Sequence, residues 1–308
     1  MDFLHKNASD ISIQEIERLY LPYQNEMKSL KGFPVLSTEE FQRQFFSLCD
    51  GYQLIEGLSD GEPSALLLYH FSEGEKNVLE IPVFGYYYRD IRDFSRLFDE
   101  LLREVVQKTT VIYVSGYCCD KKLYRFLTLT QFGVSMEYCV RKLRPIPHHS
   151  SRCSIVSLTK TEIEENWPEI WALVSSIINH LKGSPVFYFG DEFTEEAYHE
   201  FFLDDSLSLY VAKNENGQFV GLIEANVESE DFILSHVPNR NVGEAIVLEE
   251  YRGTGLAEAL LATLEKDLSS SGVSYSWVNH GTANPNAMGF WDKYFKPYRY
   301  EFERTIEI

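Results

Sequence analysis

The residues best suited to chemistry lie in one stretch of the second half of the chain, which runs Val247-Leu248-Glu249-Glu250-Tyr251-Arg252-Gly253-Thr254-Gly255-Leu256-Ala257. The N–H groups that open a helix have no partners inside it and lie at the positive end of the helix dipole, so they bind phosphate when no side chain blocks the approach. Gly253, Gly255 and Ala257 leave that approach open. This stretch predicts a phosphate-binding loop, and the alternative is a tight turn at a helix start without a ligand.

A second motif follows downstream and runs Asn284-Pro285-Asn286-Ala287-Met288-Gly289-Phe290-Trp291, with Phe295 after it. Asparagine before proline favours a turn. Asn284 is therefore either a turn residue or a polar side chain that a ligand contacts.

The elements predicted around these motifs place the first one between a strand and a helix. Asn216-Gly217 predicts a tight hairpin turn between strands over 208–213 and 218–226, and a further strand is expected over 241–248. Leucines recur every four residues from Leu256 to Leu268, which predicts an amphipathic helix over 255–270. Strands over 275–279 and 298–308 complete this half.

The same arrangement occurs twice in the chain. Leu30-Lys31-Gly32-Phe33-Pro34-Val35 returns as Leu181-Lys182-Gly183-Ser184-Pro185-Val186, at an offset of 151, and Tyr88-Arg89 returns as Tyr251-Arg252, at an offset of 163. A collinear series whose offset grows in steps indicates duplication followed by loop insertions. The prolines and polar residues from Pro145 to Ser151 break both periodicities, so we expect one domain over 1–146 and another over 152–308.

Composition and charge exclude several classes of protein. The 308 residues suffice for two domains of about 150 residues each. Residues 1–150 carry 17 Lys+Arg and 21 Asp+Glu (17 − 21 = −4), whereas residues 151–308 carry 11 and 26 (11 − 26 = −15). Such a field repels nucleic acid and anionic membranes and favours a small cationic partner, although solubility alone also explains it.

The remaining composition predicts a cytoplasmic protein without a metal. The five cysteines lack C-x-x-C spacing and read as reduced thiols, and the eight histidines lack the spacing of metal ligands. We expect no membrane span and no secretory signal. The sequence leaves open whether the protein is a monomer or a homodimer.

Taken with its context, the pattern Arg252-x-x-Gly255-x-Ala257 after a Val-containing strand resembles the acyl-CoA pyrophosphate loop of the GNAT acyltransferase superfamily. The second motif is similar to that family's helix, which an Asn three residues before an Ala opens beside the cofactor. The resemblance implies an α+β fold of two tandem GNAT-like domains, each with a mixed central sheet flanked by helices. It also implies acetyl-CoA as co-substrate and transfer of an acetyl group to an amine.

The resemblance also implies roles for individual residues. Main-chain groups of Val247 and Leu248 would hydrogen-bond the pantetheine arm, and Asn284 would contact the CoA arm. The pyrophosphate would be held by the loop and the helix start, that is by Arg252, Gly253, Thr254, Gly255, Leu256 and Ala257.

Catalytic groups are less clearly marked in the sequence. Where the family often has a tyrosine that protonates the leaving thiolate, this chain has Trp291, whose indole N–H is not a useful acid. Tyr294 is the acid we select, with Tyr298 and Tyr251 as alternatives. Glu244 is the best candidate for the base that deprotonates the amine, because it lies on the strand before the loop between apolar neighbours. Other candidates for the base are Glu224, His236 and His280.

The first half is expected to have lost the cofactor site. At the offset of 163, Gly253, Gly255 and Ala257 become Asp90, Arg92 and Phe94, so carboxylates would oppose a pyrophosphate and Phe94 would crowd the helix start. We therefore predict an N-acetyltransferase that acts on a small, cationic amine acceptor, with a degenerate N-terminal domain. The alternatives are a non-catalytic protein that responds to acyl-CoA or binds a partner, and an enzyme that transfers a longer acyl group.

Overall fold

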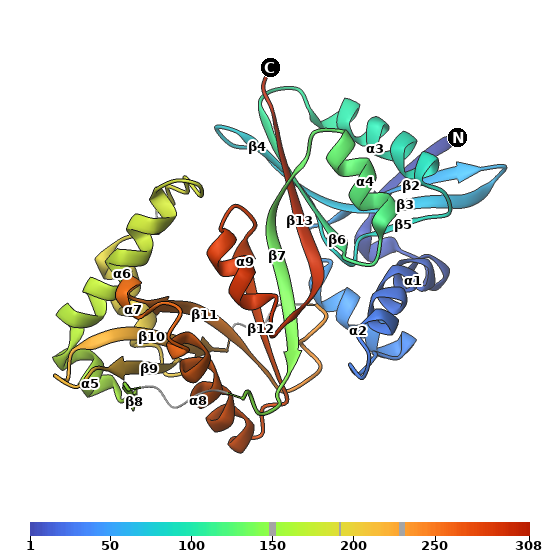
Figure 1. Ribbon diagram of the computed structural model, residues 1–308. Helices are drawn as coiled ribbons and strands as arrows, with labels where there is room; N and C mark the ends of the chain where they lie inside the picture. The colour runs from blue at the N-terminus through green and yellow to red at the C-terminus, as the bar shows by residue number, and fades with distance from the viewer. Residues whose placement is uncertain (148–151, 191, 228–231) are drawn as a thin grey trace. The chain divides into compact units, whose positions relative to one another are not determined.

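The computed structural model describes residues 1–147, 152–190, 192–227 and 232–308. The chain divides into two compact units, of which unit 1 comprises Met1–Tyr138 with Lys296–Ile308, and unit 2 comprises Cys139–Phe295 (Figure 1). The last part of the predicted linker, 148–151, lies outside the described residues. Among the helices of the described residues, none combines the length and apolarity that crossing a membrane requires.

Unit 1 is a mixed sheet with helices packed on it. Its strands follow the order β1-β2-β3-β4-β6-β13-β7, and β5 pairs with β3. The strands are β1 (Asp2–Asn7), β2 (Gln53–Ser59), β3 (Glu62–Ser72), β4 (Asn77–Ile81), β5 (Tyr86–Tyr88), β6 (Thr110–Tyr117), β7 (Gly133–Lys142), whose last four residues belong to unit 2, and β13 (Lys296–Ile306). The helices are η1 (Ala8–Asp10), α1 (Ile13–Ser29), α2 (Thr38–Leu48), α3 (Ile91–Val105) and α4 (Lys121–Leu129).

Unit 2 has the same kind of architecture, with the strand order β7-β12-β11-β10-β9-β8. Neighbours from β8 to β11 are antiparallel, whereas β11 and β12 are parallel. The strands are β8 (Ser154–Leu158), β9 (Ser208–Lys213), β10 (Phe219–Asn226), β11 (Asn239–Val247) and β12 (Tyr275–Gly281). The helices are α5 (Lys160–Glu165), α6 (Trp167–Lys182), α7 (Glu195–Phe202), η2 (Glu249–Tyr251), α8 (Leu256–Ser270) and α9 (Pro285–Trp291).

Two apolar cores cover the two faces of the unit 2 sheet. Residues alternate along β9, so that Leu209 and Val211 join the core with α6 and α7, whereas Tyr210 and Ala212 join the core with α8 and α9. This alternation is what a sheet covered on both faces requires. The expected α+β fold with a mixed sheet is confirmed in both halves.

The predicted elements around the motifs agree with the structure to within a few residues. The hairpin closes with the Asn214 N–H donating to the Gln218 carbonyl at 3.0 Å, and Gly217 takes a φ of +81°. Each half also begins with a strand that the sequence analysis does not predict, β1 and β8. β1 is mostly exposed and lacks a regular alternation, so only its pairing with β2 defines it.

The final strand of the chain belongs to the first unit. β13 pairs antiparallel with β6, from Arg299 opposite Tyr117 to Ile306 opposite Thr110, and Phe302 is buried in that unit. The expected division at 147–151 follows the order of the sequence, whereas the compact units depart from that order at both β7 and β13.

Candidate functional site

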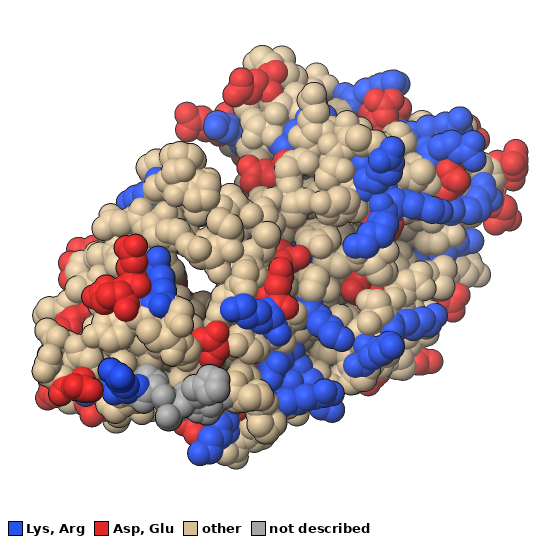
Figure 2. Space-filling view, viewed as in Figure 1, with Lys and Arg blue, Asp and Glu red and all other residues tan. Residues whose placement is uncertain are grey.

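The parallel strands β11 and β12 part from each other after a short ladder. Their register runs from Asn239 opposite Tyr275 to Asn241 opposite Trp277, but β11 continues to Val247 and β12 to Gly281. A gap therefore opens within the sheet, and it is narrowest at Asn241 and widest toward the start of α8. Figure 2 shows a deep opening in the surface of unit 2 where Figure 1 draws α6, α9 and β11 around it.

Val247 and Leu248 end β11 at the wide end of the gap and differ in what their main chains bind. The Leu248 N–H donates to the Val220 carbonyl at 3.0 Å, and its carbonyl accepts from the Tyr251 N–H at 2.9 Å. Val247 lies opposite Gly221 between the ladder bonds, so its N–H and carbonyl point away from β10 toward the gap. The main chain of Leu248 is thus committed within the protein, and the expected contact with pantetheine falls to Val247.

A bulge in β11 lies beside the narrow end of the gap. The register with β10 shifts between Ile223 and Ala225, so that Gly243 and Glu244 lie opposite Glu224. The Glu224 carboxylate, whose residue is 0% exposed, accepts the Glu244 N–H at 2.9 Å. A Cβ on Gly243 would lie 1.9 Å from Glu224 Oε1, so any larger residue here would force the buried Glu224 carboxylate to move.

Glu244, the predicted base, is half-buried on the face covered by α6 and α7. The Tyr198 hydroxyl from α7 donates to Glu244 Oε1 at 2.9 Å. Burial raises the pKa of Glu244, and the hydrogen bond from Tyr198 lowers it in part. Burial also raises the pKa of Tyr198, and the negative charges of Glu244, Glu192 and Glu224 raise it further.

The predicted phosphate-binding loop connects β11 to α8 and leaves the helix start uncapped. Gly253 and Gly255 take φ values of +73° and +84°, and a Cβ at either position would meet nothing within 4 Å. Among the described residues, no side chain caps α8, and its first internal bond runs from the Ala259 N–H to the Gly255 carbonyl. The N–H groups of Leu256, Ala257 and Glu258 precede that bond, so they are the donors a phosphate would meet.

Other residues of the loop hold its shape. Arg252 is exposed and its Nε donates to the Val247 carbonyl at 3.1 Å, while the Thr254 hydroxyl donates to the Tyr251 carbonyl at 2.6 Å. The acidic Glu258 of the first helical turn lies 3.9 Å from the Lys293 ammonium, which offsets its charge beside the loop.

Asn284 is the N-cap of α9. Its Oδ1 accepts the Ala287 N–H at 3.3 Å and lies 3.3 Å from Nε2 of His180 at the end of α6. The helix-opening role is therefore present in the structure, and the side-chain amide nitrogen is the group left to reach a ligand.

The structure does not bring the two predicted catalytic side chains together. Tyr294 packs against the α8 and α9 core, 5.4 Å from the Phe290 ring, and its pKa is raised by burial and by neighbouring Glu258. Glu244 lies on the other face with Tyr198. Trp291 is buried in the same core as Tyr294, so it serves packing.

Sequence reasoning missed Tyr198 and Asn241. Tyr198 is one of 19 tyrosines, and nothing in its spacing marks it. Asn241 carried a usable signal, because asparagine is depleted in strands and this one is the third residue of β11.

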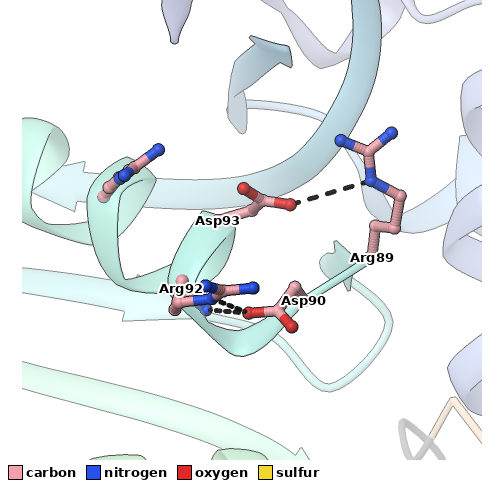
Figure 3. A pocket seen from close by; sticks show the side chains of 5 residues that line it. Arg89, Asp90, Arg92 and Asp93 are labelled. Atoms are coloured by element: carbon pink, nitrogen blue, oxygen red, sulfur yellow. Dashed lines mark hydrogen bonds and ion pairs between the residues drawn. The ribbon is translucent and has the colours of Figure 1, made fainter.

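The corresponding helix start in unit 1 is satisfied by its own side chains. The Asp90 carboxylate caps α3 by accepting the Arg92 N–H at 2.9 Å, and it also pairs with Arg92 Nε at 2.8 Å (Figure 3). Arg89 and Asp93 face each other at 3.9 Å across a hollow of about 290 Å³, which Arg96 completes. Figure 2 shows basic side chains gathered over α3 and α4, but carboxylates occupy the helix start itself.

The two helix starts also revise the expected alignment of the halves. α8 begins at Leu256 and α3 at Ile91, so the starts are 256 − 91 = 165 residues apart, and Asp90 corresponds to Gly255. Phe94 then corresponds to Ala259, and both are buried. The expectation that Phe94 crowds the helix start is wrong, because its ring points into the core beside Phe98 and Phe126.

The gap is closed in unit 1. β4 pairs with β6 along its whole length, from Asn77 opposite Thr110 to Ile81 opposite Val114. Beyond that ladder, the Tyr86 hydroxyl accepts the Tyr117 N–H of β6 at 3.2 Å, and Tyr86 is 1% exposed. A tyrosine side chain therefore takes the strand N–H that would otherwise face a gap.

Comparison with known proteins identifies the fold. Residues 174–295 match the family described as "Acetyltransferase (GNAT) family". No curated protein matches the sequence.

Similar solved structures include a GCN5-related N-acetyltransferase from Sphaerobacter thermophilus (14% identity, TM-score 0.59, covering 99% of this chain and 98% of that one). A GCN5-related glucosamine N-acetyltransferase region of a fungal multi-domain GH3 beta-N-acetylglucosaminidase is also similar (13% identity, TM-score 0.52, covering 99% of this chain and 38% of that one). Since both span nearly the whole chain, the fold extends through the first half as well.

Proposed function

We propose that this chain, whose residues 174–295 match the GNAT acetyltransferase family, transfers an acetyl group from acetyl-CoA to the amine of a small acceptor by direct attack. One observation carries the proposal, namely that β11 and β12 part at Asn241 and Trp277 and the gap leads to the uncapped start of α8. A gap with strand donors along one side and helix donors at its mouth suits an extended arm that ends in a diphosphate.

Residues of the loop would hold acetyl-CoA in this gap. The N–H groups from Gly253 to Ala257 would bind the pyrophosphate, with the exposed Arg252 beside them. The Val247 N–H would bind the pantetheine arm, and the Asn284 amide nitrogen would contact it from the start of α9.

Glu244 would act as the base on the acceptor. An amine attacks a thioester only when it is neutral, and the raised pKa of Glu244 makes its carboxylate a stronger base than an exposed glutamate. The nitrogen lone pair would form the C–N bond to the thioester carbon while the C–S bond breaks and its electron pair leaves on sulfur. Tyr294, on the other face of the sheet, remains our candidate for the acid that would give its proton to that thiolate, and the second amine proton would replace the one that Tyr294 gives up.

The acceptor we favour is a small molecule with a cationic amine. Tyr198 donates a hydrogen bond to Glu244, and the negative charges of Glu192 and Glu224 also act on its hydroxyl, so this side of β11 suits an ammonium group. The net charge of −15 in residues 151–308 (11 − 26) would draw such a molecule to unit 2.

A thiol-release assay tests the proposed function. The purified full chain would be mixed with acetyl-CoA and a panel of polyamines, aminoglycosides, arylalkylamines, amino acids and lysine peptides. We expect at least one amine to raise CoA release well above the rate without acceptor, with one acetylated amine formed per thiol. Propionyl-CoA and longer acyl-CoA thioesters in the same assay would reveal a preference for a larger acyl group.

The non-catalytic alternative gives a different result in the same experiment. Trp291, which stands where the family often has a tyrosine, favours that alternative. If calorimetry shows tight binding of acetyl-CoA while no amine is acetylated, the protein responds to acyl-CoA without turning it over, and the proposed enzyme is rejected.

A further inference from the structure

Asn241 has a buried amide group that the protein itself leaves unsatisfied. The residue is 2% exposed, and among the residues that the structure describes, no hydrogen-bond partner lies within reach of its Nδ2 atom. Buried polar nitrogens nearly always have a hydrogen-bond partner. Without one, no hydrogen bond offsets the free energy lost when the nitrogen leaves water. Such a donor therefore points to a partner that comes from outside the chain.

The place of Asn241 in the sheet indicates which partner this is. Asn241 and Trp277 form the last pair of the ladder between β11 and β12, so the gap begins at this residue. Its Oδ1 lies 3.3 Å from the position that a Cβ on Gly243 would take, so the amide extends along the strand toward the bulge. The residue that carries the unpaired donor thus lies at the narrow end of the gap, three residues before Glu244 on β11.

The gap fixes the direction in which acetyl-CoA would lie. Its wide end adjoins the start of α8, where the diphosphate would bind, and its narrow end is about six residues, or about 20 Å, back along β11. An arm extended from the diphosphate reaches the narrow end with its last atoms, which are the sulfur and the acyl carbonyl. The oxygen that comes closest to Asn241 is then the carbonyl oxygen of the thioester.

We propose that Asn241 is a catalytic residue that donates a hydrogen bond from Nδ2 to the thioester carbonyl oxygen; this rests on the proposed function. Negative charge develops on that oxygen when the amine attacks, so a donor fixed beforehand stabilises the transition state more than the ground state. No proton leaves Asn241. The C–N bond forms, the C–S bond breaks, and the protons move as described for Glu244 and the leaving thiolate.

Binding measurements test this without any need for turnover. Calorimetry on the full chain would compare acetyl-CoA with CoA and with S-ethyl-CoA, which has no carbonyl oxygen. We expect the wild-type protein to bind acetyl-CoA about fivefold more tightly than either analogue, the difference that one neutral hydrogen bond makes. Asn241→Leu, which keeps the size but removes the donor, should abolish that preference while CoA affinity stays within twofold.

Kinetics supply the second measurement. Asn241→Leu should lower kcat about 100-fold for every amine, and should equally slow hydrolysis of acetyl-CoA without acceptor, with no change in KM for the amine. The matched control is Asn239→Leu, two residues earlier on β11, whose amide is already bonded to the Leu234 and Val237 carbonyls and to Trp277. That variant should lose stability without changing the preference for acetyl-CoA.

Each other outcome counts against the inference in a distinct way. Equal binding of all three ligands by the wild-type protein, with acetylation intact, overturns the role of Asn241 alone. An effect of Asn241→Leu that is confined to the KM of the amine assigns the residue to the acceptor instead. If no CoA species binds at all, the proposed function fails together with the inference. Should Asn241→Leu not fold, Asn241→Ser and the wild-type comparison with S-ethyl-CoA decide the question.

Discussion

The two halves of the chain contain the same strand, loop and helix, but they satisfy the exposed main-chain donors in opposite ways. In unit 1 the Asp90 carboxylate caps α3, and the Tyr86 hydroxyl accepts the Tyr117 N–H beyond the β4 ladder. In unit 2 the start of α8 has no cap among the described residues, and β11 leaves β12 at Asn241. Helix direction and sheet geometry are common to both, so they do not make a site by themselves. We expect a ligand site only where no side chain of the protein bonds to these main-chain N–H groups.

The bulge in β11 and the corresponding bend between β4 and β5 also differ in the side chains that they present. In unit 2 the bulge carries Glu244 and rests on the carboxylate of Glu224. In unit 1 the bend between β4 and β5 consists of Pro82, Val83, Phe84 and Gly85, none of which can titrate. Phe84 is buried there and packs against Phe45 at 5.9 Å. One bend thus presents a carboxylate, and the other completes an apolar core.

The largest effect is expected when a charge is placed on the open helix start. Gly255→Asp should weaken acetyl-CoA binding about a thousandfold, since two like charges about 4 Å apart near a protein surface repel by about 4 kcal/mol. Isothermal titration calorimetry measures the affinity, and circular dichroism checks the fold. Gly255→Asn is the matched control, because asparagine must adopt the same positive φ but carries no charge. Its loss of acetyl-CoA affinity should be far smaller. Equal losses for the two variants would mean that shape, and not charge, governs this position.

Opening the closed half should damage folding and leave the site intact. Tyr86→Ala removes a fully buried ring and should lower the free energy of unfolding by about 3–5 kcal/mol. Tyr86→Phe removes only the hydroxyl that accepts the Tyr117 N–H and should cost about 1–2 kcal/mol. Urea denaturation measures both values. Acetyl-CoA affinity should not change in Tyr86→Phe, and a loss of affinity there would show that unit 1 contributes to binding after all.

Removing the charge from the bulge should separate activity from stability. Glu244→Gln keeps the hydrogen bond from Tyr198 but removes the base, so kcat should fall about 100-fold, or about 2.7 kcal/mol. Activity of the wild-type protein should rise with pH through a pKa above the ordinary glutamate value of 4.5, because burial disfavours the charged form. The variant should lack that rise, and a retained rise would assign it to another group.

The same raised pKa has a consequence for stability whose sign can be worked out. Glu244 binds its proton more tightly in the folded protein than in the unfolded chain, so its contribution to stability is complete at pH values below the unfolded pKa. That contribution is lost as the pH rises through the folded pKa. Glu244→Gln should therefore melt close to the wild-type temperature near pH 4 and at a higher temperature near pH 8. Differential scanning calorimetry at the two pH values measures this.

The smallest effect is expected at the capped helix start. Asp90→Ala removes the acceptor of the Arg92 N–H and should cost about 1 kcal/mol of unfolding free energy. Asp90→Asn, which can still cap, should cost less. Neither variant should create a second acetyl-CoA site, because Tyr86 still occupies the strand donor. If calorimetry detects two acetyl-CoA sites in Asp90→Ala, the helix cap alone, and not the closed strand gap, keeps acetyl-CoA out of unit 1.

The sequence was sufficient for the fold class and for most second-half elements, although it missed β8 and assigned β13 to the wrong half. Leucines at four-residue spacing and the Asn216-Gly217 turn are local signals, and the structure has α8 and the β9–β10 hairpin where they predict. What failed depends on contacts between distant residues. Tyr198 meets Glu244 from 46 positions away, and the burial of Asn241 depends on how β11 leaves β12. Phe94 was assigned to the wrong environment because an alignment by offset does not see the longer loop before α8.

The position of β13 bears on how this protein is made. Unit 1 has the first residues of the chain, but its sheet includes a strand that ends at Ile306. A ribosome that has released residues 1–146 has therefore not yet supplied everything the first unit needs, because β6 cannot pair with β13 until residues 296–306 have been synthesised. Unit 1 is therefore completed only after residues 139–295 of unit 2 have been made, and the two units cannot be expressed as separate pieces simply by cutting the gene at the linker.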